Sequence, residues 1–299
     1  MCKETLGKKE RAMRRRHALR KWIVFAALLS TACGGAVPEP ASGPLKILVT
    51  NDDGIEAPGI LALADALKPL GTVTVAAPRE NRSGVSHGVT SDRAIAVIES
   101  ENQGVAWFAI DALPATCVRL ALESLLTDKP DLVVSGINKG ENLGTVTFYS
   151  ATVAGAREPA FLGIPAISVN LAAGKGMDYQ TAAGITVDIV RALGKDGIPK
   201  GTFLNINIPA LARAEIKGLR ITRQDTRAPI NLYQKFVTPE GATVYKPSWK
   251  HLEPAGEDTD VWAVRNGYIS VSVFGIDQSA AANTTARKSL GRLEKLTWK

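Results

Sequence analysis

Short apolar runs alternate with helical segments between residues 45 and 208, and this alternation limits the possible folds more than any other feature. The spacing predicts an α/β fold with a mainly parallel sheet covered on both faces, because a crossover helix joins each pair of parallel strands. The predicted strands are 45–50, 72–77, 131–135, 166–170 and 203–208, with a β-pair at 94–98 and 105–110, and the predicted helices are 58–70, 114–126, 150–162 and 179–193.

The pattern changes after Pro209. Residues 218–250 are predicted to be an extended excursion with little helix, and residues 268–274 one more strand. We therefore expect one folded domain over residues 45–277, followed by a mostly helical tail at 278–299.

Residues 1–32 have the order of a secretory signal peptide, because a basic segment precedes the apolar run Trp22–Leu29. That run is shorter than the roughly 20 apolar residues of a transmembrane helix. Cys33 follows a small-residue cleavage site and resembles the lipid-attachment Cys of bacterial lipoproteins, although Ser30 stands where such sites prefer Leu. A simple cleaved signal is the alternative. Residues 33–44 are rich in Pro, Gly, Ser and Ala and are predicted to be a flexible tether.

The leader therefore predicts an exported protein, either periplasmic or on the outer surface of a bacterium, with membrane contact only through a lipid at Cys33. If the leader comes from a misassigned start, the expectation is a cytoplasmic protein. Cys117 is the single Cys beyond the leader, so no intrachain disulfide framework is expected. Its apolar helical surroundings predict a buried side chain.

The formal net charge of +7 does not indicate a nucleic-acid partner. Residues 1–32 hold nine of the 36 Lys and Arg residues and two of the 29 acidic residues, which leaves 27 of each beyond position 32. Because the rest of the chain is formally neutral, the sequence disfavours nucleic-acid binding.

Two adjacent carboxylates, Asp52 and Asp53, follow the first predicted strand. Ligands of open α/β sheets bind at the carboxyl ends of the strands. Like charges this close repel each other, and a hard divalent cation with oxygen ligands would relieve the repulsion. The alternative is a solvated turn, because Asn51-Asp52-Asp53-Gly54 has favourable turn chemistry.

The next strand ends add further polar loops. Ser83 and His87 lie in the loop after the second strand, where a hydroxyl suits a phosphate or a metal. Asn138 follows the strand at 131–135, and its neutral amide oxygen suits Mg²⁺ or Mn²⁺ beside two carboxylates. Each loop alone is equally compatible with an ordinary surface loop or a Gly-rich bend, but three such loops at strand ends favour a common site.

Four collinear motifs, at residues 48–60, 77–84, 131–144 and 149–154, resemble those of the SurE family of 5′/3′-nucleotidases, and residues 203–209 and 266–272 resemble its later strands. The resemblance implies a three-layer α/β/α Rossmann-like sandwich. It also implies hydrolysis of nucleoside 5′-monophosphates, and 3′-monophosphates as a further substrate, with one divalent metal ion per subunit (Mg²⁺ or Mn²⁺). Homodimers or homotetramers would form through the extended C-terminal segment.

The hypothesis for the mechanism assigns catalysis to Asp52 and Asp53, one of which would orient or deprotonate the attacking water. Asn142, Ser150 and Thr152 would bind the substrate phosphate. Positions that match the family give the metal ligands. The implied metal ligands are Asp52, Asp53, Ser83 and Asn138.

The chain departs from the family pattern at Thr145-Val146, where Asp-Asp is common, and at Ala151, where Gly is usual. These departures leave the substrate less defined than the metal site. Two alternatives therefore stay open: a phosphatase for other phosphoesters or short polyphosphate, and a non-catalytic lipoprotein that binds a nucleotide or phosphate. An aspartyl-phosphate route is disfavoured because Gly54 stands at the second position of an Asp-x-Asp pattern.

Overall fold

The structure is a computed structural model that describes residues 43–194, 197–227, 230–250, 253 and 256–279. These residues belong to one compact unit, Ser42–Lys299. The predicted signal peptide, Cys33 and nearly all of the predicted tether lie outside the described residues, as does the predicted helical tail beyond residue 279.

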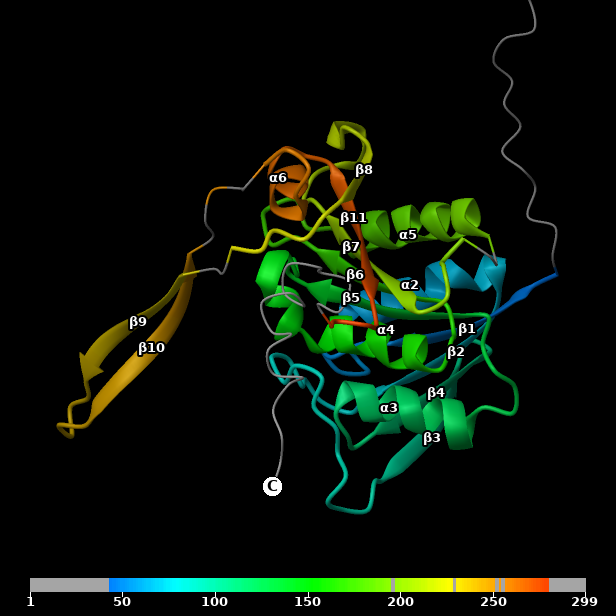
Figure 1. Ribbon diagram of the computed structural model, residues 1–299. Coiled ribbons are helices and arrows are strands. Elements are labelled where there is room, and N and C mark those ends of the chain that lie inside the picture. The colour runs from blue at the N-terminus through cyan, green and yellow to red at the C-terminus, as the bar shows by residue number, and fades with distance from the viewer. Residues whose placement is uncertain (1–42, 195–196, 228–229, 251–252, 254–255, 280–299) are drawn as a thin grey trace, which may run out of the picture. The chain divides into compact units, whose positions relative to one another are not determined.

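A nine-stranded sheet forms the centre of the fold, in the order β3-β4-β2-β1-β5-β6-β7-β11-β8 (Figure 1). Most neighbouring strands are parallel, but β3 is antiparallel to β4 and β11 is antiparallel to β7. The strands are β1 (Leu45–Thr50), β2 (Gly71–Pro78), β3 (Val97–Asn102), β4 (Val105–Ile110), β5 (Leu132–Lys139), β6 (Ala166–Leu171), β7 (Thr202–Ile208), β8 (Leu219–Thr222) and β11 (Ile269–Gly275).

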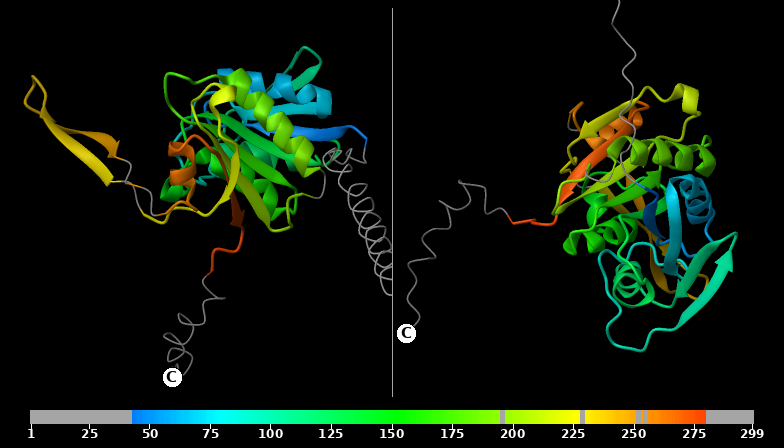
Figure 2. Two further views of the ribbon diagram at one scale, coloured as in Figure 1. Left: turned by 90° about the horizontal axis from the view of Figure 1, so that it is seen from above. Right: turned by 90° about the vertical axis from the view of Figure 1, so that its right-hand side faces the viewer.

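Helices cover both faces of this sheet, which confirms the predicted three-layer α/β/α arrangement (Figures 1 and 2). Residues of α2 (Pro58–Leu67) and α5 (Tyr179–Leu193) share one apolar core with the sheet. Residues of α3 (Pro114–Leu120) and α4 (Ala151–Phe161) share a second core on the other face. Cys117 is buried in this second core, as predicted.

Local sequence chemistry accounts for where the helices start. Pro58 and Pro114 occupy the first helical positions of α2 and α3, where the fixed φ of Pro suits a helix and its missing N–H is not needed. Ser150 and Asp178 cap α4 and α5 by accepting backbone hydrogen bonds. Gly155 lets α4 approach the strand ends, because a Cβ there would lie 2.5 Å from the Ser135 Oγ.

The C-terminal part is extended, as predicted for residues 218–250. Strand β8 joins the main sheet beside β11, while β9 (Ile230–Val237) and β10 (Thr243–Lys250) form a separate two-stranded sheet. A short helix that the sequence pattern did not predict, α6 (Asp260–Arg265), precedes β11. Among the residues that the structure describes, no helix is both long enough and apolar enough to span a membrane.

Candidate active site

Asp52 and Asp53 lie directly after β1, at the carboxyl edge of the sheet. The Asp52 side chain is buried, and its Oδ1 accepts a hydrogen bond from the Thr152 hydroxyl at the start of α4. Burial raises the pKa of Asp52 to about 6, and the neighbouring Asp53 charge adds to this rise, while the Thr152 and Ser83 hydroxyls oppose it. Asp52 is therefore a carboxylate whose negative charge the protein itself stabilises poorly.

Asp53 has different partners. Its Oδ2 accepts a hydrogen bond from the Lys139 backbone amide at 3.1 Å, and the Asn81 Nδ2 lies 3.5 Å from its Oδ1. Burial raises the pKa of Asp53, and the amide and charge of Lys139 oppose that rise. The two carboxylates are thus oriented by different elements, Asp52 by α4 and Asp53 by the end of β5.

Strand β5 continues to Lys139, beyond the predicted end at residue 135. A β-bulge between Ser135 and Asn138 shifts the register, and pairing with β6 resumes at Asn138. Gly136 permits the bulge: its φ is +148°, and a Cβ would lie 2.4 Å from a backbone oxygen of β6. Asn138 donates its Nδ2 hydrogen bond to the Gly140 carbonyl at 2.9 Å. The Asn138 Oδ1 consequently faces away from that carbonyl.

The loop after β2 is fastened to the same edge. The Arg82 amide donates to the Asp52 carbonyl at 2.7 Å, which holds the loop beside the carboxylates. Ser83 donates its own amide to the Asn81 Oδ1 at 2.9 Å, and its hydroxyl lies close enough to Asp52 to lower the pKa of that carboxyl. The structure therefore brings Ser83 to the Asp52–Asp53 pair.

Of the three predicted phosphate-binding residues, two lie at the start of α4. The Ser150 Oγ accepts the Val153 amide as the helix cap, so its hydroxyl hydrogen is not used by that bond. Thr152 is instead committed to Asp52. Ala151 has no solvent-exposed surface, so its methyl group lies within the packing and outside the open space before the helix.

Asn142, the third residue, is buried in a network that no sequence motif indicates. Its Nδ2 donates to the Asn170 Oδ1 at 2.6 Å, and its backbone N–H and C=O bond to side chains of β7. One of its amide hydrogens is therefore already used within the protein. The available signal was the pair Asn205 and Asn207 in an otherwise apolar strand, where buried amides require partners.

A second network that the sequence did not reveal fastens the Ser83 loop to α4. The His87 Nε2 lies 2.7 Å from the Glu158 Oε2, and Arg119 binds the other oxygen of Glu158. Burial would raise the pKa of Glu158, but these two partners bring it below its ordinary value. No short sequence spacing links these residues, because they come from a loop, α3 and α4.

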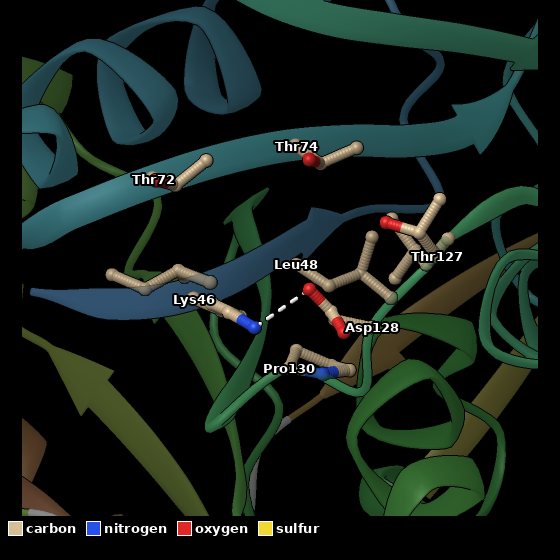
Figure 3. Close-up of a pocket in the computed structure, with 9 residues that line it drawn as sticks. Lys46, Leu48, Thr72, Thr74, Thr127, Asp128 and Pro130 are labelled. Carbon is tan, nitrogen blue, oxygen red and sulfur yellow. Dashed lines mark hydrogen bonds and ion pairs between the residues drawn. The ribbon is translucent and has the colours of Figure 1, made fainter.

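Two hollows in the described part of the chain lie at different places relative to the carboxyl edge of the sheet that carries Asp52 and Asp53. Figure 3 shows one of about 260 Å³ around the starts of β1 and β2, where Lys46 and Asp128 form an ion pair at 2.7 Å. It contains no candidate site residue. The other, of about 450 Å³, is lined by Glu56, Glu80 and Trp107 and lies beside the loops that carry the site.

The sheet order and the paired carboxylates at its carboxyl edge define a Rossmann-like α/β protein with an acidic, oxygen-lined site. Comparison with known proteins identifies the family. The family described as survival protein SurE matches residues 47–231, so the chain belongs to the SurE family.

Similar proteins share most of the chain. It is 43% identical over 235 residues to the 5′-nucleotidase SurE of Alkalilimnicola ehrlichii, covering 78% of this chain and 90% of the relative. It is 43% identical over 239 residues to the 5′/3′-nucleotidase SurE of Cronobacter sakazakii, covering 79% and 92%. The crystal structure of the SurE protein from Aquifex aeolicus matches with a TM-score of 0.73 and 41% identity, covering 83% of this chain and 99% of that one.

Proposed function

We propose that the chain is a divalent-metal-dependent phosphomonoesterase that hydrolyses nucleoside 5′-monophosphates, and 3′-monophosphates as a further substrate, to nucleoside and phosphate. The observation that carries the proposal is the Asp52–Asp53 pair, in which a buried carboxylate with a pKa of about 6 adjoins a second carboxylate. Membership of the SurE family and the nucleotidase names of its relatives support this reading.

The residues at this edge fit one Mg²⁺ or Mn²⁺ ion. Among the described residues, no three or more His, Cys, Asp or Glu side chains gather in a cluster that could hold a metal, so the proposed site includes a hydroxyl and an amide. Two carboxylates with a hydroxyl and an amide oxygen form the donor set that hard divalent ions prefer. Asp52, Asp53, Ser83 and Asn138 would hold the ion. Such an ion lowers the pKa of a bound water and neutralises charge on the phosphate.

The chain's own residues would position the reacting groups. The Thr152 hydroxyl and the Lys139 amide orient Asp52 and Asp53 before substrate arrives. One of these carboxylates would orient the attacking water or accept its proton. The Ser150 hydroxyl would donate to a phosphate oxygen, and the positive end of the α4 dipole would favour the same anion.

The decisive test is phosphate release from a panel of nucleoside monophosphates in EDTA, Mg²⁺ and Mn²⁺, for the wild type and Asp53→Ala. We expect activity only with metal and a large loss in the variant. Asp128→Ala is the matched control, because it removes an exposed carboxylate from the hollow at the start of β1. Full activity in EDTA, or an unchanged Asp53→Ala enzyme, would contradict the metal site. Faster turnover of sugar phosphates or short polyphosphate would contradict the proposed nucleotidase activity. Metal-independent nucleotide binding without turnover would indicate a binding protein.

We also propose that the protein is a homodimer or homotetramer assembled through β9 and β10. An isolated two-stranded hairpin is marginally stable in water. This hairpin exposes large apolar side chains that another copy of the chain would cover: Tyr233, Phe236, Val237, Val244 and Tyr245. Light scattering should give a multiple of the chain mass, and Phe236→Asp should lower it. A monomeric wild type would contradict the proposal.

Export with lipidation at Cys33 is a further proposal, supported by the order of the charged and apolar segments in residues 1–33. Mass spectrometry of the protein purified from its native host should find an acylated Cys33 as the first residue. An N-terminus at Met1 or Met13 would contradict export, and an unmodified N-terminus near Cys33 would indicate a simple cleaved signal.

A further inference from the structure

Two adjacent aromatic side chains, Phe148 and Tyr149, stand half-exposed directly before Ser150, the cap of α4. Their exposed fractions are 47% and 53%. Neither belongs to any of the hydrophobic clusters formed by the described residues. The pair therefore lies next to the proposed phosphate-binding residue without an apolar partner from the protein's cores.

The backbone of this pair is fixed to the loop that carries Ser83. The Ser86 amide donates to the Tyr149 carbonyl at 3.0 Å, and the Ser86 hydroxyl donates to the Phe148 carbonyl. Ser86 adopts a positive φ of 57°, which is uncommon outside Gly. The aromatic pair and the Ser83 loop are thus held in one position relative to each other.

The same segment is fixed from the C-terminal side. It forms a 3₁₀ helix, Gly144–Phe148, whose Gly144 amide donates to the buried Asp260 carboxylate at 2.7 Å. The Gln224 Nε2 donates to the Gly144 carbonyl and to the Thr147 Oγ1, each at 2.9 Å. These bonds restrain the backbone that carries Phe148 and Tyr149, so the place of the pair beside Ser150 is set before a ligand binds.

We propose that Phe148 and Tyr149 form an aromatic platform on which the base of a nucleoside monophosphate stacks while its phosphate lies at Ser150. The inference rests on the proposed function and adds the residues that recognise the nucleoside. Stacking suits this position because an aromatic ring binds any base through its π-face. The platform therefore predicts broad base tolerance, with purines moderately preferred for their larger stacking area.

The hollow of about 450 Å³ beside the site is the competing position for the base. Glu56 and Glu80 lie on its rim, and Trp107 also lines it. The indole nitrogen of Trp107 is buried and has no hydrogen-bond partner within the described structure. A base in this hollow could not reach that N–H without displacing protein atoms. Ile98, 51% exposed at its wall, offers a matched site for removing apolar surface.

The test compares substrates with and without a base, using the full-length wild type, Phe148→Ala, Tyr149→Ala, Tyr149→Phe and Ile98→Ala. We expect the two alanine variants of the platform to lower kcat/KM for adenosine 5′-monophosphate by roughly 5- to 100-fold, mainly through KM, because stacking of one base is worth that much. Their kcat/KM for ribose 5-phosphate should stay within about twofold. Tyr149→Phe and Ile98→Ala should behave like the wild type.

Calorimetric binding of adenosine 5′-monophosphate and ribose 5-phosphate in EDTA, without turnover, separates this inference from the proposed function. If the wild type lacks phosphatase activity but the alanine variants weaken only the nucleotide, the nucleotidase fails and the platform stands. Equal losses for both ligands, no loss for either, or no preference of the wild type for the nucleotide would overturn the platform. A selective loss in Ile98→Ala would place the base in the neighbouring hollow instead. A changed oligomer mass in Phe148→Ala and Tyr149→Ala would assign the pair to a subunit contact.

Discussion

Asp52 and Asp260 are both buried carboxylates, yet the protein treats them differently. Their exposed fractions are 3% and 0%, and burial raises the pKa of each. Asp260 accepts three backbone N–H bonds, from Gly144 at 2.7 Å, Asp225 at 3.0 Å and Val261 at 2.8 Å. At Asp52, the side-chain donors that lower the pKa are the hydroxyls of Thr152 and Ser83, and Asp53, a second carboxylate, follows directly in the chain.

The comparison distinguishes a structural carboxylate from one suited to an external cation. Asp260 joins three segments of backbone. Burial raises its pKa, the three amides lower it, and the charge of Asp225 raises it further. At Asp52 no amide of another described segment lowers the pKa, the two hydroxyls do not offset burial, and the adjacent Asp53 charge raises the pKa further. Buried carboxylates of this second kind concentrate at functional sites because a bound ion can supply what the protein does not.

Replacement of Asp52 by Asn should have the largest effect on activity. We expect kcat/KM for nucleoside monophosphates to fall by about 10³-fold, because both a metal ligand and a group that positions water are lost. Steady-state kinetics in saturating Mn²⁺ measures this loss. In EDTA the variant should unfold at the same or higher denaturant concentration, since an amide is less costly to bury than a carboxylate. A variant that is both inactive and strongly destabilised would show that Asp52 is structural.

Asp260→Asn should show the opposite pattern. The substitution replaces one carboxylate oxygen, which accepts a backbone N–H bond, with an NH₂ group that faces the same N–H donor. We therefore expect a loss of about 3 to 4 kcal/mol in the free energy of unfolding. Metal affinity should be unchanged, because Asp260 interacts with residues outside the proposed ligand set. Denaturant titration and Mn²⁺ binding of the same sample check both points. Normal stability would remove the contrast with Asp52.

The sequence predicts the architecture well because each element has a local signature. The apolar run at 45–50, Pro58 and Pro114 at helix starts, and Ser150 as a cap are sufficient to place β1, α2, α3 and the start of α4 near their observed positions. The same logic brings Asp52, Asp53, Ser83 and Asn138 to one edge, because parallel strands end on the same side of a sheet.

The sequence could not predict how these residues are held. Thr152 was expected to bind phosphate, yet it donates to Asp52, across 100 residues of chain. Asp260 begins a short helix without a strong periodic pattern, and its partner Gly144 lies 116 residues away. Such pairings depend on the arrangement of whole elements, which no local spacing encodes.

The raised pKa of Asp52 predicts how the metal-free protein responds to pH. The folded pKa of about 6 exceeds the ordinary value of 3.8, so the native state binds more protons between these values. The contribution of Asp52 to stability is therefore present below pH 4 and is lost as the pH rises through 6. Relative to Asp52→Asn, the metal-free wild type should lose about 2 to 3 kcal/mol between pH 4 and pH 7.

Urea titrations in EDTA across that range measure the difference, and added Mg²⁺ should reverse the loss at pH 7 because the ion binds the charged form. Parallel stability curves for the wild type and Asp52→Asn would contradict the assignment of the raised pKa to Asp52. Asp53 shifts in the same direction and is retained in both proteins, so the difference measures Asp52 together with its electrostatic coupling to Asp53.

Thr152→Val should have the smallest effect and tests the donor that distinguishes the environment of Asp52. Loss of the hydroxyl removes a hydrogen bond that lowers the pKa of Asp52. The acidic limb of the pH profile for kcat/KM should therefore move to higher pH. At pH 7 we expect a loss of about 1 kcal/mol in transition-state stabilisation. Thr186→Val is the matched control, because it removes a buried hydroxyl that bonds only within α5. It should lower stability without moving the acidic limb. A shift of equal size in both variants would show that Thr152 acts through packing and not through its bond to Asp52.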